Sequence, residues 1–301
     1  MEFLFSVFTP TYNRANTIGR TYEYLCKQTL RSFEWIIVDD GSTDNTEEIV
    51  QKWINTNKIS IVYLKQENGG KHRAFNRAVQ IAKGEIFICL DSDDYYIETA
   101  LEIIYSYHLI HKDNPWIAGF SCNSLDLHGN LIGTSLPVDE LVVSHYNLYN
   151  SLSVKGDKGL IYYTRILKEY PFPEFENEFF VTEALVLNRI SLRYKICCIK
   201  RSLEIKDYQR DGLSSKYRHL CLRNPNGYAL YINERNYFNL SFTNYVINAA
   251  SYVRYSLFAG KSFRNIYKEA INRRWTFIIA CFLGILLYLS LIHISEPTRP
   301  Y

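Results

Sequence analysis

The sequence predicts an α/β fold in which helices flank a mostly parallel sheet and a helical extension follows it. Residues 3–112 alternate between short β-rich runs and helical patterns, with turn residues at nearly every change. Four strand–helix units in succession imply parallel strands, because a helix is the usual connection between them. Residues 228–271 show only helical spacing of their apolar side chains, which predicts the extension.

The first four strand–helix units can be placed along the chain. The predicted strands are residues 3–8, 35–38, 59–64 and 86–90. Apolar residues at helical spacing then predict helices around residues 18–25, 49–53, 75–82 and 97–104. Ser42-Thr43-Asp44 is typical of a helix cap, and Gly84 is expected to end the third helix.

The pattern is looser after residue 112. Further strands are predicted at 116–122, 160–164 and 194–199, with a hairpin turn at 126–130. Residues 134–158 are polar and irregular, which predicts a long functional loop. Helices are expected at 182–193, 228–236, 243–258 and 263–271.

Composition excludes several classes of protein. The chain has 301 residues, of which 47% are hydrophobic and 22% charged, so global disorder and a multi-span membrane protein do not fit. A net charge of +3 gives no reason to expect a nucleic-acid partner. Seven cysteines without a CxxC pair suit a reducing compartment. Met1-Glu2 lacks the start of a secretory signal, and we therefore expect a cytoplasmic protein.

Polar residues follow each of the first four predicted strands, at 9–13, 39–42, 68–72 and 91–94. Ligands of open parallel sheets collect at these strand ends. The sequence contains neither GxGxxG after the first strand nor GxxxxGK[ST], so the usual phosphate loops are absent. The ends are instead rich in carboxylates, which would repel a diphosphate unless a divalent cation lay between them. Asp91 and Asp93 are therefore predicted to bind Mg²⁺ or Mn²⁺.

Four sequence blocks at these strand ends resemble the family 2 glycosyltransferases, which have the GT-A fold. The blocks are FSVFTPTYNRANTIGRTYEYLCKQ, WIIVDDGSTDNTEEIV, NGGKHRAFNRAVQIAKGE and FICLDSDD, and a weaker match, PFPEFENEFFVTEALVLNRI, extends the similarity to about residue 215. Four blocks in the right order are far more specific than a lone DxD. The resemblance implies a metal-dependent, inverting, hexosyltransferase-type enzyme. Such an enzyme moves a sugar from a nucleotide-diphosphate donor, here a UDP-sugar, to a hydroxyl of a glycan or lipid-linked acceptor in surface polysaccharide biosynthesis.

The resemblance also implies a role for each matched residue. The implied substrate-binding residues are Pro10, Tyr12, Asp39, Asp40, Lys71 and Asp91. The implied metal ligands are Asp91, Asp93 and Asp94. His72 is expected to be a polar group of the same pocket, near the diphosphate.

Inverting transfer also needs a base that takes the proton of the acceptor hydroxyl. The family usually places this acid in a Glu-Asp pair at a helix start, and Thr182-Glu183-Ala184 occupies the matching place. The resemblance thus implies Glu183 as the base, with Glu178 in reserve. Residues 211–214, DGLS, resemble a later block of one branch of the family.

Structural alternatives and other functions stay open. Asp39 and Asp40 could cap the following helix, and residues 91–94 could form a solvated turn. Because Ala184 replaces the second acid of the pair, a non-catalytic subunit that binds a sugar nucleotide or a glycan is an alternative. A nucleotidyltransferase is a weaker one, since the Gly-rich loop of that class is missing after the first strand.

The predicted organisation is a GT-A domain at 1–215, with a nucleotide-sugar-binding half at 1–112 and an acceptor half at 113–215, and a helical extension at 216–289. Residues 290–301, SLIHISEPTRPY, resemble translated sequencing-adapter read-through, and we expect them to be a non-native tail. Without them, the uncharged run from residue 275 shrinks from eighteen residues to fifteen. That length favours a core-capping helix or one at a membrane surface over a span. The basic flank, Arg264, Lys268, Arg273 and Arg274, favours the anionic cytoplasmic face of a membrane.

Overall fold

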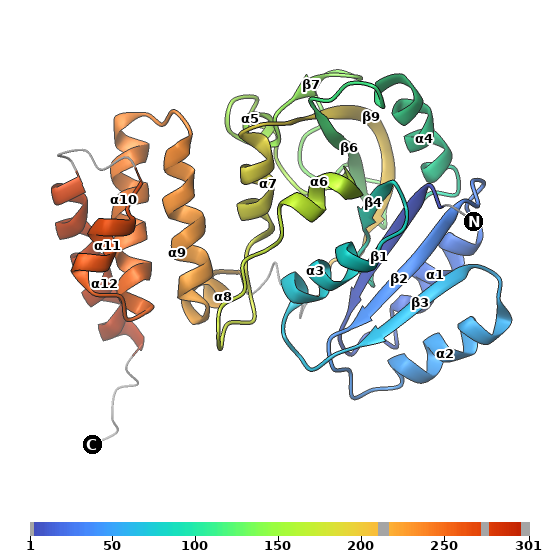
Figure 1. The fold of residues 1–301 in the computed structure, drawn as a ribbon, viewed down its shortest axis with the longest axis horizontal. Helices are drawn as coiled ribbons and strands as arrows, with labels where there is room; N and C mark the ends of the chain where they lie inside the picture. The colour runs from blue at the N-terminus through green and yellow to red at the C-terminus, as the bar shows by residue number, and fades with distance from the viewer. Residues whose placement is uncertain (1–2, 210–216, 272–276, 296–301) are drawn as a thin grey trace. The chain divides into compact units, whose positions relative to one another are not determined.

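The computed structural model describes residues 3–209, 217–271 and 277–295, and it confirms the α/β fold (Figure 1). The strands are β1 (Phe5–Thr11), β2 (Phe33–Asp39), β3 (Ser60–Lys65), β4 (Ile86–Cys89), β5 (Tyr95–Tyr96), β6 (Ile117–Asp126), β7 (Val142–Val143), β8 (Lys158–Tyr163) and β9 (Lys195–Lys206). The first helices are α1 (Ile18–Cys26), α2 (Thr46–Thr56), α3 (Lys71–Ile81), α4 (Ala100–His111), α5 (His145–Asn150), α6 (Thr164–Glu169) and α7 (Glu183–Ser191). The later ones are α8 (Tyr217–Arg223), α9 (Pro225–Glu234), a 3₁₀ turn (Arg235–Tyr237), α10 (Phe242–Phe258), α11 (Phe263–Glu269) and α12 (Phe277–Ser295).

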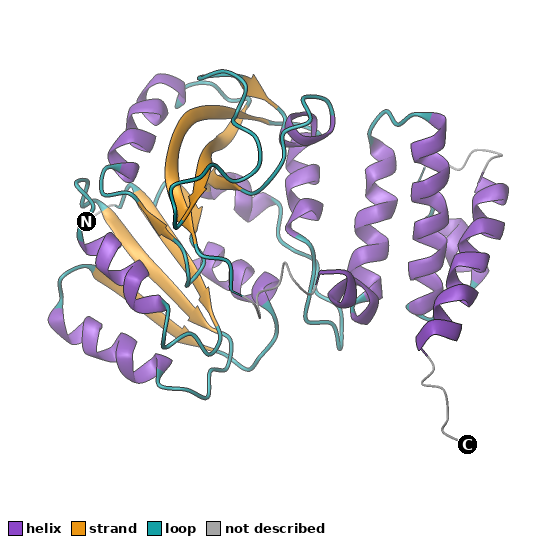
Figure 2. Cartoon of the chain, turned by 180° about the vertical axis from the view of Figure 1, so that it is seen from behind, coloured by secondary structure: helices purple, strands orange, loops and turns teal. Residues whose placement is uncertain are grey.

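The described strands form one mixed sheet in the order β3-β2-β1-β4-β8-β6-β9-β5, with β7 paired to β9. Strands β1 to β4 are mutually parallel, so their carboxyl ends share one edge. Right-handed crossovers place α1 and α2 on one face of this half and α3 on the other. Figure 1 shows α3 in front of the strands, and Figure 2, from behind, shows α1 and α2 in front.

The chain divides into two compact units. The first contains residues 1–172 and 186–212, and the second contains residues 173–185 and 213–301. Val7, Trp35 and Ile88 are fully buried in the core of the first unit, which is the sheet with its covering helices. Ala249 and Val253 of α10 are fully buried at the centre of the helical second unit.

Several predictions about the second half of the sheet are corrected. Residues 134–158 are not wholly irregular, because β7 and α5 lie within them. Strand β9 is longer than predicted, and β5, α6 and α8 were not expected. The hairpin turn is confirmed, since the Asp126 N–H donates to the Asn130 carbonyl at 2.9 Å. The DGLS block, together with Arg273 and Arg274, lies outside the described residues.

Helix α12 covers part of the uncharged C-terminal run. None of the helices in the described part of the chain is both long and apolar enough to cross a membrane.

Candidate active site

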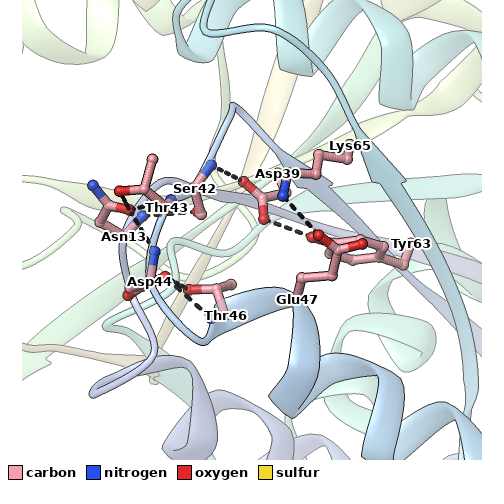
Figure 3. Close-up of polar contacts among 9 residues, drawn as sticks. All are labelled: Asn13, Asp39, Ser42, Thr43, Asp44, Thr46, Glu47, Tyr63 and Lys65. Atoms are coloured by element: carbon pink, nitrogen blue, oxygen red, sulfur yellow. Dashed lines mark hydrogen bonds and ion pairs between the residues drawn. The ribbon is translucent and has the colours of Figure 1, made fainter.

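The loops that leave β1 and β2 are fastened to each other (Figure 3). Asn13 adopts a positive φ of 52°, and its side-chain carbonyl accepts the N–H of Thr43 at 2.8 Å. The Asn13 N–H donates to Ser42 Oγ at 2.8 Å. Asp44 Oδ2 accepts the N–H of Ala15 at 3.0 Å. These reciprocal hydrogen bonds hold the loop after β1 and the loop after β2 in a fixed position relative to each other.

Asp39 ends β2 and has no exposed surface. Its Oδ1 accepts the N–H of Ser42 at 2.7 Å, and its Oδ2 accepts the hydroxyl of Tyr63 at 2.6 Å (Figure 3). Burial and the negative charge of Asp39 raise the pKa of Tyr63, so the phenol stays a donor. One Asp39 oxygen therefore holds the loop after β2, and the other binds Tyr63 of β3.

Asp40 fastens a different loop. Its Oδ1 accepts the Gln66 side-chain amide and the Gly69 N–H, both at 2.8 Å, and its Oδ2 accepts the Gly70 N–H at 2.7 Å. Gly70 has a φ of +91°, a conformation that suits glycine, and it directly precedes α3. Asp40 thus positions Lys71, the first residue of α3. Asp39 and Asp40 do not cap α2, because none of the hydrogen bonds described for their carboxylates comes from that helix.

Lys71 connects the start of α3 to the DxD sequence after β4. Its Nζ lies 2.7 Å from Asp91 Oδ1. Burial raises the pKa of the Asp91 carboxyl, but the nearby cations Lys71, Lys206 and Arg14 outweigh it, so the net shift is downward. The pKa of Asp93 is raised, first by burial and then by the charge of Asp91. Asp91 and Asp93 are therefore two close carboxylates that repel each other.

Asp94 has a different environment from its two neighbours. Its Oδ2 lies 2.9 Å from Lys206 Nζ, and its Oδ1 accepts the Asp207 N–H at 3.0 Å. Burial raises the pKa of Asp94 to about 7 against the influence of Lys206. Glu204 is a second buried carboxylate, with an oxygen 3.4 Å from Lys206 Nζ. Asp94 thus ties the DxD loop to the end of β9.

Arg20 of α1 holds the same loop through its backbone. Its Nη2 donates to the Asp93 carbonyl at 2.7 Å and to Asp207 Oδ2 at 2.6 Å. The Arg20 guanidinium also lies over the Tyr95 ring, 5.4 Å from the ring centroid. Sequence reasoning missed Arg20, Lys206 and Asp207, because the partners that join them to the DxD loop are more than 70 residues away and no local pattern marks them.

The remaining predicted donor-site residues lie at the same strand ends. Pro10 is the second-to-last residue of β1 and is partly buried, and Tyr12 follows β1 with 47% of its surface exposed. His72 is buried in the first turn of α3.

The two predicted bases belong to the second unit, whereas the aspartates belong to the first. Glu183 is the first residue of α7 and is exposed. Glu178 is 4% exposed. Its Oε1 accepts the Asn226 N–H at 2.7 Å, and its Oε2 accepts the Gly227 N–H at 2.9 Å. Glu178 therefore caps the start of α9, where the N–H groups have no partner within the helix.

Within the described ranges, no group of three or more His, Cys, Asp or Glu side chains forms a metal-binding cluster. Asp91 and Asp93 nevertheless fit a hard divalent cation, since Mg²⁺ and Mn²⁺ accept one or two carboxylates completed by substrate phosphates. Burial and then the charge of Asp91 raise the pKa of Asp93, and a bound cation would relieve the repulsion between the two carboxylates.

The carboxyl edge of the parallel strands thus combines the buried Asp39 and Asp40 with the partly buried Asp91 and Asp93, at the place where ligands of open α/β sheets bind. Residues 6–125 match the profile described as Glycosyl transferase family 2, so this part of the chain is similar to that family.

Individual relatives agree with this assignment. The chain is 35% identical over 149 residues to glycosyltransferase GlyG of Streptococcus pneumoniae, a match that covers 48% of each protein. It is 32% identical over 200 residues to the poly(ribitol-phosphate) β-N-acetylglucosaminyltransferase TarS of Staphylococcus aureus, which covers 62% of the chain and 34% of TarS. The chain thus spans about half the length, or less, of these curated relatives.

Solved structures show the same fold. The structure of residues 1–349 of S. aureus TarS in complex with UDP-GlcNAc superposes with a TM-score of 0.62 at 19% identity, covering 98% of this chain and 93% of that one. The mannosyltransferase PcManGT of Pyrobaculum calidifontis, in complex with GDP-Man and Mn²⁺, superposes with a TM-score of 0.54 at 15% identity, covering 97% and 87%. These likenesses confirm the GT-A fold.

Proposed function

We propose that the protein is a metal-dependent inverting glycosyltransferase that moves a sugar from a UDP-sugar to a hydroxyl of a glycan or lipid-linked acceptor in surface polymer synthesis. The observation that carries this proposal is the pair Asp91 and Asp93 at the exit of β4, in a loop held by Arg20, Asp94 and Lys206. UDP-GlcNAc is the first donor to test, because a TarS structure contains it. Seven free cysteines support a reducing, cytoplasmic place of action.

Each residue at the strand ends has a proposed task. Asp91 and Asp93 would hold Mn²⁺ or Mg²⁺, which when bound neutralises charge on the leaving diphosphate. Lys71 adds a cation beside Asp91. Tyr12 offers an exposed aromatic face to the base of the nucleotide. Asp94 stays a predicted third ligand, although both its oxygens already hold β9.

Asp39 and Asp40 act on the donor site by holding its loops in place. They fix the loops near Pro10 and Tyr12, so we propose that they shape the nucleoside pocket.

We propose Glu183 as the base that takes the proton of the acceptor hydroxyl. Its exposed position at a helix start supports this choice. The alternative, Glu178, is buried, and its two oxygens accept the first N–H groups of α9. Glu183→Gln should therefore reduce kcat by at least about 100-fold without changing stability. Glu178→Gln should instead lower the thermal midpoint while residual activity per folded molecule persists, and the reverse outcome would exchange the two roles.

The test of the donor site compares Asp93→Asn with Asp113→Asn, an exposed loop aspartate, as the matched control. Donor hydrolysis and transfer are followed with UDP-GlcNAc and other UDP- and GDP-sugars in Mn²⁺, and Mn²⁺ binding is titrated by calorimetry. We expect Asp93→Asn to lose Mn²⁺ binding and turnover while it stays folded. Full activity in a chelator contradicts the metal role. Saturable donor binding without turnover in the unmodified protein supports the non-catalytic alternative.

A further inference from the structure

Helix α12 has one apolar face that packs inside the second unit. Phe277 and Ala280 are buried in the helical core, and a side chain at Gly284 would meet the Ala250 carbonyl and Val253 of α10 at 2.6 and 2.7 Å. This close approach of two helices fixes which side of α12 faces α10.

The opposite face of α12 is also apolar, and it is exposed. Between residues 277 and 289 no side chain carries a charge. The exposed apolar side chains of this face are Ile278, Ile279, Phe282, Leu283, Leu286, Leu287 and Leu289. The two most exposed, Phe282 at 67% and Leu286 at 63%, are one helical turn apart. Seven exposed apolar side chains within 13 consecutive residues are unusual on a soluble surface, and such a concentration marks an interaction site.

Helix α11 adds exposed aromatic rings and cations to the same unit, close to the start of α12. Phe263 and Tyr267 are 53% and 56% exposed, and the Tyr267 ring lies 6.1 Å from that of Phe277, the first residue of α12. Arg264 and Lys268 are exposed next to them, one turn apart. The acidic residue of α11, Glu269, is already paired with Lys261 at 2.7 Å.

The wider charge distribution selects the partner. Residues 213–289 contain ten basic and two acidic residues, and residues 173–185 of the same unit add four acidic ones, so these two segments together carry a net charge of +4. A second copy joined by a twofold axis would bring these like charges together. An anionic lipid surface complements them, since basic residues are attracted to it and an apolar helix face can enter the headgroup boundary.

We infer that the face formed by α11 and α12 binds an anionic membrane surface, with α12 lying in the plane of the surface rather than crossing it. The packing of the other α12 face on α10 enforces this orientation. Membrane binding does not depend on catalysis, and its failure would leave the proposed transferase function untouched.

The test measures co-sedimentation of the full chain with vesicles of phosphatidylglycerol or of phosphatidylcholine. Phe282→Ser with Leu286→Ser removes the two most exposed side chains of the α12 face, and Arg264→Glu with Lys268→Glu reverses the α11 charges. Ile110→Ser, at a 63% exposed apolar residue of α4 in the first unit, is the matched control.

We expect at least tenfold stronger binding to phosphatidylglycerol than to phosphatidylcholine. The double serine variant should lose at least tenfold. The charge reversal should cost at least about 30-fold on phosphatidylglycerol only, given about 1 kcal/mol for each basic residue near such a surface. Ile110→Ser should bind like the unmodified chain. The inference is overturned if the unmodified chain does not bind anionic vesicles. It is also overturned if analytical ultracentrifugation shows that the unmodified chain is a dimer and the double serine variant a monomer.

Discussion

Replacing Asp40 by alanine should destabilise the protein even though the residue lies at a ligand-binding edge. The substitution removes all three hydrogen bonds that the carboxylate accepts. The Gly69 N–H is buried, and leaving it unpaired costs about 1–3 kcal/mol. The Gln66 and Gly70 donors are partly exposed and can turn to water, so each loses about 0.5–1 kcal/mol. The free energy of unfolding should therefore fall by about 3 kcal/mol, a large share of the stability of a typical domain.

Asp40→Asn separates charge from geometry. The asparagine carbonyl can replace Oδ1 and keep the bonds from Gln66 and Gly69, but its amide would face the Gly70 N–H donor to donor. We expect a loss of about 1–2 kcal/mol, between that of the alanine variant and none. Asp113→Ala, at an exposed loop position, should stay within about 0.5 kcal/mol of the unmodified protein.

Urea unfolding followed by tryptophan fluorescence and by circular dichroism measures all three variants. The midpoint should shift while the slope stays constant, because the surface exposed on unfolding is unchanged. If Asp40→Ala unfolds within about 0.5 kcal/mol of the unmodified protein, the loop is held by something other than Asp40, and the proposed shaping of the nucleoside pocket is wrong.

Three other perturbations test separate parts of the structure. Burial lowers the pKa of His145 to about 4, so the folded state binds fewer protons than the unfolded state, and the free energy of unfolding should fall as the pH drops from about 6.5 towards 4. His145→Phe should flatten this part of the pH dependence in urea unfolding. An unchanged slope would contradict the burial of His145. Gly84→Ala would drive a methyl group into the backbone of β1 and should lower the free energy of unfolding by about 2–3 kcal/mol. Gly19→Ala, where the added methyl group meets open space, should raise it by about 0.5–1 kcal/mol. Equal unfolding midpoints for the two variants would refute the close contact at Gly84. Arg20→Met should weaken Mn²⁺ binding about 5–30-fold, measured by calorimetry, because it removes the hydrogen bond to the Asp93 carbonyl. Unaltered Mn²⁺ affinity would show that this hydrogen bond is not needed for metal binding.

The parallel half of the sheet could be predicted because burial on both faces leaves a continuous apolar run. Every residue of β2 is buried, and Trp35 to Val38 is such a run. The short strands β5 and β7 could not be predicted, since two residues show no periodicity. Their pairing with β9 is decided by tertiary contacts, which also extend β9 beyond its apolar segment.

The individual tasks of the carboxylates could be predicted far less well than their location. Strand order alone puts residues 39, 40, 91, 93 and 94 at one edge. What each does depends on partners that are distant in sequence, such as Tyr63 for Asp39 and Lys206 for Asp94. No spacing rule encodes these partners, and the resemblance to a family transfers a position but not the hydrogen bonds that surround it.

The hydrogen bonds divide these acids into two kinds, and the division predicts how variants should be interpreted. Asp39, Asp40 and Asp94 have both oxygens engaged by protein donors, so their removal disturbs loops and lowers stability together with activity. Asp93 has a pKa raised by burial and by Asp91, so neutralising it removes a repulsion and should leave stability unchanged or higher while metal binding is lost. An alanine scan that measured activity alone would count all of them as ligands. Activity and the free energy of unfolding, measured on the same variants, separate residues that hold the metal from residues that hold a loop. The structure predicts that Asp93 belongs to the first group and that Asp39, Asp40 and Asp94 belong to the second.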